Sequence, residues 1–232
     1  MRILISHLTR MKAGYICVAG LDLNNRKHVR PVIGGRLGVE LLLKNGGVFE
    51  IGAMIDLGPT RFVGTAPEVE DHQFNPGNLK LLGMSQPRDF WDMIHGESAT
   101  DLATIFGPSL ALHGRACAVD LNQGAASLGC LALPRGSSLY VDPYDKIRLR
   151  LNDGTFAPAL SITDLRLYED DQETPRHRLI RILADRLVEE DVLLSVGLSR
   201  AWKKPRDTES RHWLQVNNLH FKDDPLGRRA FS

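Results

Sequence analysis

One segment of the chain alternates strictly between polar and apolar residues, and it constrains the fold more than any other feature. In Lys146–Leu151 the even positions are Lys or Arg and the odd positions are Ile or Leu. A period of two predicts a half-buried β-strand, and the Asn152-Asp153-Gly154 sequence after it is typical of a hairpin turn. We therefore expect antiparallel strands in this part of the chain.

The residues that follow add a helix between strands. Even apolar positions continue from Phe156 to Ile162, whereas Leu165 and Leu167 are odd, which predicts a β-bulge near Thr163. Next, an N-cap threonine and a proline open a segment with helical apolar spacing, so we expect a helix at 174–190. Its predicted apolar stripe consists of Leu179, Ile180, Leu183, Leu187 and Val188.

Two further strands are predicted at Val192–Trp202 and His212–Lys222. Counted from Lys146, the carboxyl half has three strands, one helix and two strands. This is the order of a five-stranded Greek-key barrel of the OB type, in which the helix lies between the third and fourth strands.

The amino half has the signals of a second, similar barrel. Arg2–Leu8 and Tyr15–Leu23 are rich in β-branched and apolar residues and predict an antiparallel pair, and Val39–Lys44 fits helix or strand. Helical spacing over Gln86–Ile94 and Ser98–Phe106 predicts a connection between the halves. We expect a mainly β chain with a few helices and two OB-like five-stranded Greek-key barrels: residues 1–84, a helical connection at 85–113, and residues 114–232.

Composition limits the cellular setting. The first apolar run is too short for a signal peptide, and no apolar stretch is long enough to span a membrane, so we expect a cytoplasmic protein. The three cysteines, Cys17, Cys117 and Cys130, are far apart and form no Cys-x-x-Cys pair. We expect inert, partly buried thiols, with no metal and no cofactor.

No residue set specifies a reaction. Nucleotide-binding glycine loops, a His-Glu-x-x-His motif and a Gly-x-Ser-x-Gly elbow do not occur. The acidic segment Glu68–Asp71 beside His72 could hold a cation, but a solvated acidic turn has the same composition. The sequence therefore predicts no catalytic residues and favours a binding protein over an enzyme.

Cations and aromatic rings gather where the last two predicted strands meet. Residues 200–232 carry a net charge of +4 on a chain whose formal charge is +1. Flat rings beside fixed cations suit stacking on a base and contact with a phosphate, although an ordinary hairpin end, with half-buried tryptophans and solvated arginines, fits equally. The predicted contacts here are Arg200, Trp202, Lys203, Lys204, Arg206, Arg211, His212 and Trp213.

Four further residues are candidates for the same surface. The amides of Gln215 and Asn217 could read a base edge, although Asn217 and Asn218 could equally satisfy backbone groups. Arg30 and Arg36 lie in a cationic stretch of the amino half, which fits a phosphate track or a charged edge strand. Arg148 and Arg150 fit a solvated sheet face.

Several segments taken together resemble a known family. Arg2-Ile-Leu-Ile-Ser-His, Gly14-Tyr-Ile-Cys-Val-Ala-Gly, His28-Val-Arg-Pro-Val, Ser195-Val-Gly-Leu-Ser-Arg and His212-Trp-Leu-Gln-Val-Asn-Asn are similar to the prokaryotic dual OB-containing domain family. The resemblance covers nearly the whole chain. It implies two OB-like barrels and, by analogy with other OB modules, a nucleic-acid ligand.

We therefore expect a nucleic-acid or nucleotide-binding protein that prefers single strands, with DNA and RNA both open. Two alternatives belong to other classes. A metal-dependent hydrolase acting on nucleotides or nucleic acid predicts turnover, and a protein-interaction scaffold predicts a bound protein and no salt-sensitive binding to DNA or RNA.

Overall fold

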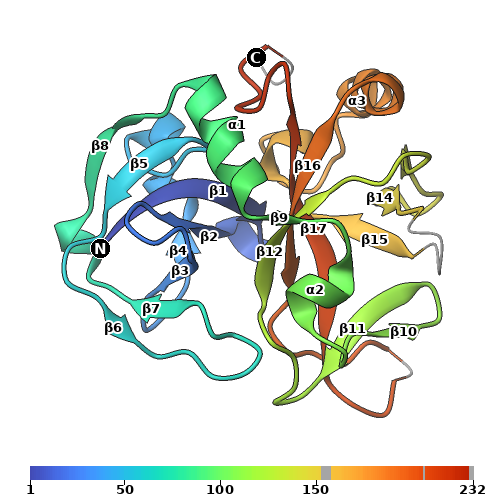
Figure 1. Cartoon of the computed structure of the whole chain (residues 1–232), viewed down its shortest axis with the longest axis horizontal. Coiled ribbons are helices and arrows are strands. Elements are labelled where there is room, and N and C mark those ends of the chain that lie inside the picture. Colours follow the sequence, from blue (N-terminus) through green and yellow to red (C-terminus); the bar gives the residue numbers. More distant parts are fainter. Residues whose placement is uncertain (153–157, 206, 230–232) are drawn as a thin grey trace.

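Each half of the chain folds around an apolar core of its own. The computed structural model describes residues 1–152, 158–205 and 207–229. Among these residues, one 8-stranded and one 9-stranded mixed sheet lie side by side (Figure 1). The chain is mainly β with a few helices and forms two OB-like barrels, as predicted. We call them the amino barrel (strands within residues 2–84) and the carboxyl barrel (strands within residues 98–221).

The amino barrel begins with the predicted antiparallel pair, which is confirmed. β1 pairs with β2 and β5, and β3 pairs with β7 in parallel. The strands are β1 (Arg2–Arg10), β2 (Tyr15–Asp22), β3 (His28–Val32), β4 (Leu37–Gly38), β5 (Ala53–Asp56), β6 (Arg61–Phe62), β7 (Asp71–Gln73) and β8 (Lys80–Met84). Short 3-10 helices lie at Lys12–Gly14, Val39–Leu41, Leu43–Asn45 and Pro76–Asn78.

The carboxyl barrel has the strand order of an OB fold. β15 pairs with β17 in parallel, and the β14–β15, β16–β17 and β12–β16 pairs are antiparallel. Because β12 and β13 are consecutive and pair with β16 and β14 respectively, they act as one interrupted first strand that closes the ring. The strands are β9 (Ser98–Ala99), β10 (Ala111–His113), β11 (Ala116–Asp120), β12 (Leu128–Ala132), β13 (Ser138–Val141), β14 (Ile147–Arg150), β15 (Ala159–Ile162), β16 (Val192–Leu198) and β17 (Arg211–Phe221).

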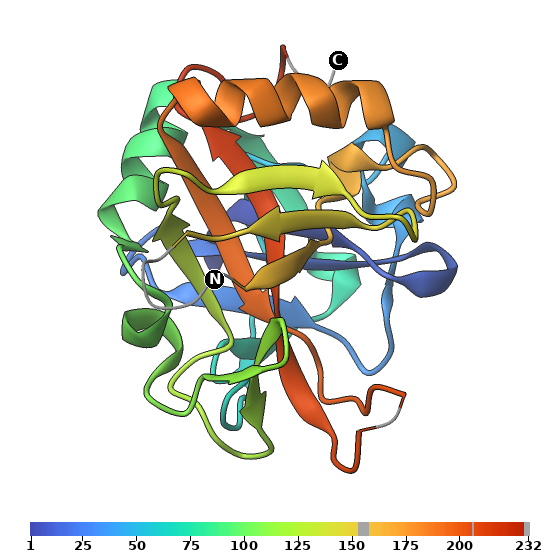
Figure 2. The same cartoon turned by 90° about the vertical axis from the view of Figure 1, so that its right-hand side faces the viewer.

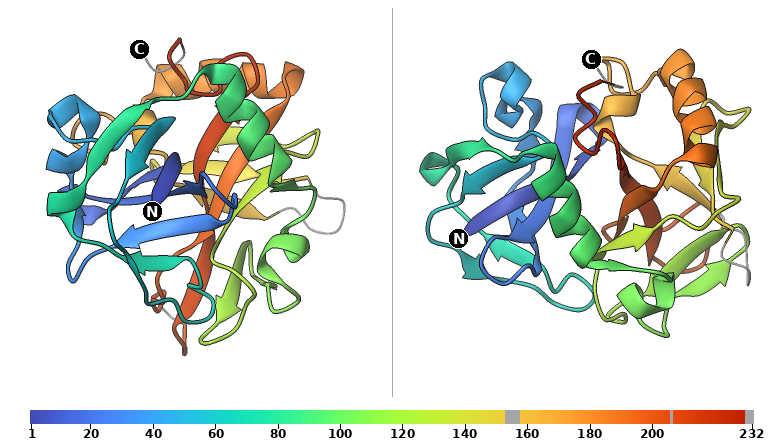
Figure 3. Two further views of the ribbon diagram at one scale, coloured as in Figure 1. Left: turned by 60° about the vertical axis from the view of Figure 1, so that its left-hand side comes forward. Right: turned by 45° about the horizontal axis from the view of Figure 1, so that its top comes forward.

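Three α-helices are present in the described part of the chain: α1 (Pro87–Gly96), α2 (Leu102–Phe106) and α3 (His177–Glu189). α1 packs Phe90 and Ile94 into the amino core, whereas α2 packs Leu102 and Phe106 into the carboxyl core. Figure 3 shows α1 over the junction of the barrels, and Figure 2 shows α3 across one end of the carboxyl barrel. The predicted division at residues 84 and 113 stays a prediction.

Several local predictions differ from the structure. The three strands before α3 start at Leu128 and not at Lys146, because the first strand is split in two. The strand expected beyond Thr163 is instead a 3-10 helix, Leu165–Leu167, since the Asp164 side chain accepts a hydrogen bond from the Arg166 backbone N–H and caps the helix. The hairpin turn predicted at Asn152-Asp153-Gly154 lies outside the described residues after Asn152.

The helix predictions also need correction. Ser98 and Ala99 form a strand against β12, so the second helix of the connection starts only at Leu102. In the amino half, the 3-10 helices Val39–Leu41 and Leu43–Asn45 lie between β4 and β5, and α1 comes after all its strands. On α3, Val188 is 71% exposed because it lies off the buried stripe of Ile180, Leu183 and Leu187.

Two acids of the predicted acidic turn, Glu70 and Asp71, are buried and not solvated, and the group of possible metal ligands found among the described residues does not include them. Glu70 and Asp71 are each 5% exposed. The Glu70 carboxylate accepts hydrogen bonds from the backbone of Ser127 and Leu128 and from the Ser127 hydroxyl. This acidic segment of the amino barrel therefore binds the start of β12 in the carboxyl barrel.

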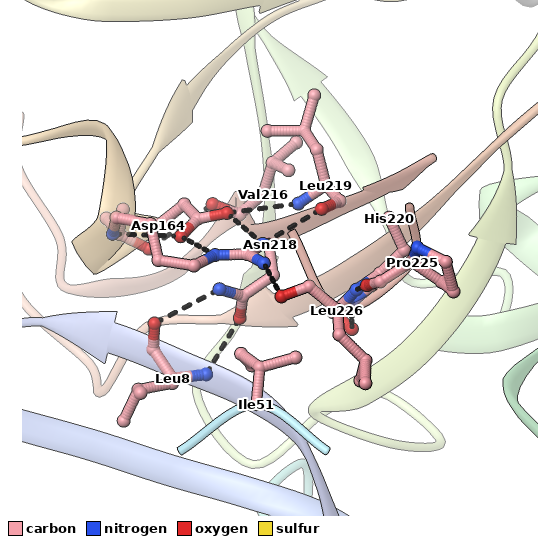
Figure 4. Close-up of polar contacts among 12 residues, drawn as sticks. Leu8, Ile51, Asp164, Val216, Asn218, Leu219, His220, Pro225 and Leu226 are labelled. Atoms are coloured by element: carbon pink, nitrogen blue, oxygen red, sulfur yellow. Dashed lines mark hydrogen bonds and ion pairs between the residues drawn. The ribbon is translucent and has the colours of Figure 1, made fainter. Parts of the chain in front are cut away.

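A buried amide joins the barrels at a second place. Asn218 is fully buried, its Oδ1 accepts from the Leu8 backbone N–H (2.7 Å), and its Nδ2 donates to the Leu8 carbonyl (3.2 Å) (Figure 4). Nearby, the Arg10 backbone N–H donates to the Thr163 carbonyl at 2.9 Å. Asn218 thus substitutes for a strand partner at the point where β1 meets the carboxyl barrel.

Replacing Asn218 with alanine should lower the free energy of unfolding by about 2 kcal/mol. Both Leu8 backbone groups would lose their partner in a buried place, which costs roughly 1 kcal/mol or more for each. Urea denaturation checks this, with Asn45→Ala as the control, because Asn45 makes an exposed side-chain bond to the Val39 carbonyl. Equal stability of the two variants would contradict this role for Asn218.

Candidate functional site

The last two strands form the hairpin that the sequence predicted. β16 and β17 pair antiparallel, and Trp202, beyond the end of β16, bridges to Arg211 of β17 with reciprocal backbone hydrogen bonds of 3.1 and 3.2 Å. The loop between them therefore projects from one end of the carboxyl barrel (Figure 2). Loops between the fourth and fifth strands are a common ligand-contacting part of OB folds.

The two tryptophans of this hairpin have different exposures. Trp202 is 45% exposed, whereas Trp213 is 6% exposed. Their ring centroids are 6.3 Å apart, and Trp213 Nε1 donates to the Trp202 carbonyl at 3.2 Å. Trp202 therefore presents a ring to solvent, and Trp213 fixes the backbone that carries it.

Lys204 covers the second ring. Its Nζ lies 3.2 Å from the centroid of the Trp213 ring, which is a cation–π contact. Partial burial lowers the pKa of the Lys204 amine, and the nearby charge of Arg148 adds to this effect. Lys203 is exposed, and Arg206 lies outside the described residues.

A row of polar side chains continues this surface across the sheet. Tyr140, Arg148, Ser161 and Gln215 are successive register partners on β13, β14, β15 and β17. Their strand neighbours face the carboxyl core, so this row lies on the outer face of the barrel. Arg148 donates to the Ser161 hydroxyl and pairs with Asp142 at 2.9 Å.

Arg150 belongs to the same face, with its guanidinium carbon 5.7 Å from the centroid of the Tyr140 ring. The strict alternation of 146–151 predicted that Arg148 and Arg150 share one exposed face. It gave no sign that this face continues into the hairpin, because the register between β15 and β17 is a long-range property.

Two other predicted cations, Arg30 and Arg200, are bound to carboxylates. Arg30 is 4% exposed and its Nε donates to Asp71 Oδ1 at 2.6 Å. Arg200 reaches the same Asp71 at 2.5 Å and Glu68 at 2.8 Å, and His212 Nδ1 lies 3.7 Å from Glu68. These residues form an ionic network between the barrels.

The remaining predicted residues are spread over three places. Arg211 pairs with Asp120 and Glu209 at 2.8 and 3.0 Å. Asn217 is buried, accepts from Gln215 Nε2 and lies 3.0 Å from His7 Nδ1. Arg36 is exposed on the amino barrel, 5.2 Å from the centroid of the Tyr15 ring. The structure thus brings together Trp202, Lys203, Lys204, Arg211, Trp213 and Gln215 at the hairpin, and the Arg211 side chain there is held by its carboxylate partners.

A cavity of about 370 Å³ lies elsewhere at the barrel junction. It is lined by residues of both barrels, including Leu8, Ile51, Tyr168 and Leu226. The residues that line it include none of the predicted contacts, so the cavity and the hairpin surface are separate features.

No helix in the described part of the chain is long and apolar enough to cross a membrane.

Comparisons with known proteins agree with the architecture. A family model described as the dual OB-containing domain matches residues 1–219. No curated protein matches the sequence. A solved structure of a murine DNA-binding protein bound to double-stranded DNA is similar over 95% of this chain and 92% of that chain, but with 8% identity and a TM-score of 0.30 it carries no argument. Because the family model spans nearly the whole sequence, the chain belongs to the dual OB-containing domain family.

Proposed function

We propose that the outer face of the carboxyl barrel binds single-stranded nucleic acid. The observation that carries the proposal is the exposed Trp202 ring beside Lys203 and Lys204, at the end of the polar row that runs to Arg148. An exposed indole offers a stacking surface for a base, and the cations can contact the phosphates on either side. OB folds use this face and this loop to bind oligonucleotides.

The preference for single strands follows from the stacking surface. A base in a duplex has both faces covered by its neighbours, whereas an unpaired base can stack on Trp202. Ser161 and Gln215 lie next to each other along the same face and offer donors and acceptors to a base edge or a ribose hydroxyl. Both DNA and RNA fit this surface.

The remaining predicted residues have supporting roles in this proposal. Trp213 and Lys204 hold the exposed ring in place, and a base could reach Trp213 only if Lys204 moved away. The Arg200 side chain is half exposed and can add a phosphate contact beside its carboxylate partners. Arg30, His212 and Asn217 are buried and would act by keeping the two barrels in register.

Replacing Trp202 with alanine should weaken binding of a single-stranded oligonucleotide roughly 5- to 150-fold. The reason is the loss of one base stack, worth about 1 to 3 kcal/mol. Fluorescence anisotropy of a labelled oligonucleotide measures the change in Kd. Phe62→Ala is the matched control, because Phe62 is a 58% exposed aromatic residue on the amino barrel. Equal affinity of the wild type and both variants would remove this assignment.

A further inference from the structure

Three side chains with metal-binding atoms meet at the junction of the barrels. His7 lies on β1, His28 on β3 and Cys130 on β12. One ligand atom from each lies within 4.8 Å of the others, and Cys130 Sγ is 3.8 Å from His28 Nε2. The two histidines belong to the amino barrel and the cysteine to the carboxyl barrel, although Cys130 packs against the amino core.

These spacings are close to those of a tetrahedral zinc site. With Zn–S of about 2.3 Å and Zn–N of about 2.0 Å, neighbouring ligand atoms lie about 3.3 to 3.6 Å apart. The Cys130–His28 distance already approaches this value. The most distant pair is no more than 4.8 Å apart and has to close by about 1.5 Å or less.

A buried nitrogen without a partner points to a ligand at this place. His7 is 1% exposed, and its Nε2 has no hydrogen-bond partner among the described residues. Its other nitrogen, Nδ1, lies 3.0 Å from Asn217 Nδ2. For Nε2 to bind a metal ion, Nδ1 has to carry the ring proton and donate it to an acceptor. A half-turn of the Asn217 amide supplies that acceptor, since it places Oδ1 against Nδ1. A buried polar atom with no partner is costly, and a metal ion would satisfy it.

We propose that His7, His28 and Cys130 bind one Zn²⁺ ion that links the two barrels. Two imidazoles and a thiolate are a donor set that Zn²⁺ prefers, and a water molecule would complete the tetrahedron. Binding forms one Zn–S and two Zn–N bonds, while the Cys130 thiol releases its proton to solvent. The charge of Arg30 nearby is balanced by its ion pair with Asp71. Because the ligands come from both barrels, we assign the ion a role in holding the barrels together.

The test begins with wild-type protein that has been stripped of metal with a chelator. Titration with Co²⁺ should saturate at one equivalent and give a thiolate-to-cobalt charge-transfer band together with the strong visible bands of tetrahedral Co²⁺. Zn²⁺ should remove both sets of bands. A free Zn²⁺ concentration a hundredfold above its Kd should raise Tm by about 5 to 10 °C. Absence of the charge-transfer band in the folded wild type would overturn the proposal.

Variants then identify the ligands. Cys130→Ala should lose the charge-transfer band and the Zn²⁺-dependent rise in Tm, whereas Cys117→Ala, which removes a buried thiol of the carboxyl core, should keep both. If Cys130→Ala does not fold, His28→Gln serves instead, with loss of stoichiometric binding as the expected result. A charge-transfer band that persists in Cys130→Ala, or disappears in Cys117→Ala, would assign the metal to another thiol and overturn the site.

Discussion

Replacing Asp71 with alanine should lower the free energy of unfolding by about 3 to 5 kcal/mol. Its carboxylate pairs with two arginines, Arg30 at 2.6 Å and Arg200 at 2.5 Å, and its side chain is 8% exposed. Arg30 is itself buried, and its Nη2 already has no hydrogen-bond partner among the described residues. Without Asp71 the buried Arg30 charge would lose its ion-pair partner in a poorly hydrated place, which is the costly way to break a buried ion pair.

Urea denaturation of the variant measures this loss. The matched control is Asp170→Ala, which breaks the ion pair of Asp170 with Lys44 at 3.0 Å, where the two side chains are 89% and 58% exposed. Exposed pairs of this kind contribute about 1 kcal/mol or less. If Asp71→Ala were no more destabilising than Asp170→Ala, the ionic network would not be what holds the barrels together.

The second large effect is a loss of stability in acid that depends on His220. This ring is fully buried. Burial, together with the charge of Arg166, lowers the pKa of His220 from 6.5 to about 4. The Pro225 carbonyl, 3.0 Å from Nδ1, and the Ser6 carbonyl, 3.2 Å from Nε2, act in the opposite direction as hydrogen-bond acceptors, but burial outweighs them. The fold therefore favours the uncharged form.

The direction of the effect follows from this depressed pKa. Between pH 4 and pH 6.5 the unfolded chain binds a proton at this histidine that the folded chain does not. The contribution of His220 is thus fully present above pH 6.5 and is lost as the pH falls to about 4. A difference of about 2.5 pH units corresponds to about 3 kcal/mol.

Comparison of the wild type with His220→Gln isolates the contribution of His220 to the pH dependence of stability. The difference in their free energies of unfolding should shrink by about 3 kcal/mol between pH 7 and pH 4, since the variant has no imidazole to protonate. NMR titration of the folded wild type gives the pKa directly. A His220 pKa near 6.5 in the folded protein would contradict the account.

Local sequence patterns predicted a strand or helix well where only one face of that element packs against the core. The alternation of Lys146–Leu151 gave β14 because Ile147 and Leu149 face the core and the arginines do not. The same reasoning was inconclusive for β17, where neither set of alternate residues is cleanly apolar. The structure explains this: a bulge at Asn217 shifts the register, so that Leu214 and Val216 face the core before it and Leu219 and Phe221 face the core after it.

Contacts between distant segments account for what the sequence could not predict at the site. The hairpin cations were visible as a cluster, but their partners Glu68, Asp71 and Asp120 come from elsewhere in the chain. The sequence analysis left open whether Asn217 and Asn218 contact a ligand or satisfy backbone groups. Asn218 does the second, because its amide hydrogen-bonds both backbone groups of Leu8. No spacing rule connects His7, His28 and Cys130, because the packing of two barrels brings them together.

Binding of labelled oligonucleotides at two salt concentrations tests the central claim most directly. The proposed surface predicts that single-stranded DNA or RNA binds more tightly than the duplex of the same sequence. With about three phosphate contacts, a fourfold rise in salt should weaken single-strand binding roughly 20-fold. Absence of salt-sensitive binding to single-stranded DNA, single-stranded RNA and duplex alike would contradict the assignment of the carboxyl barrel as a nucleic-acid interface.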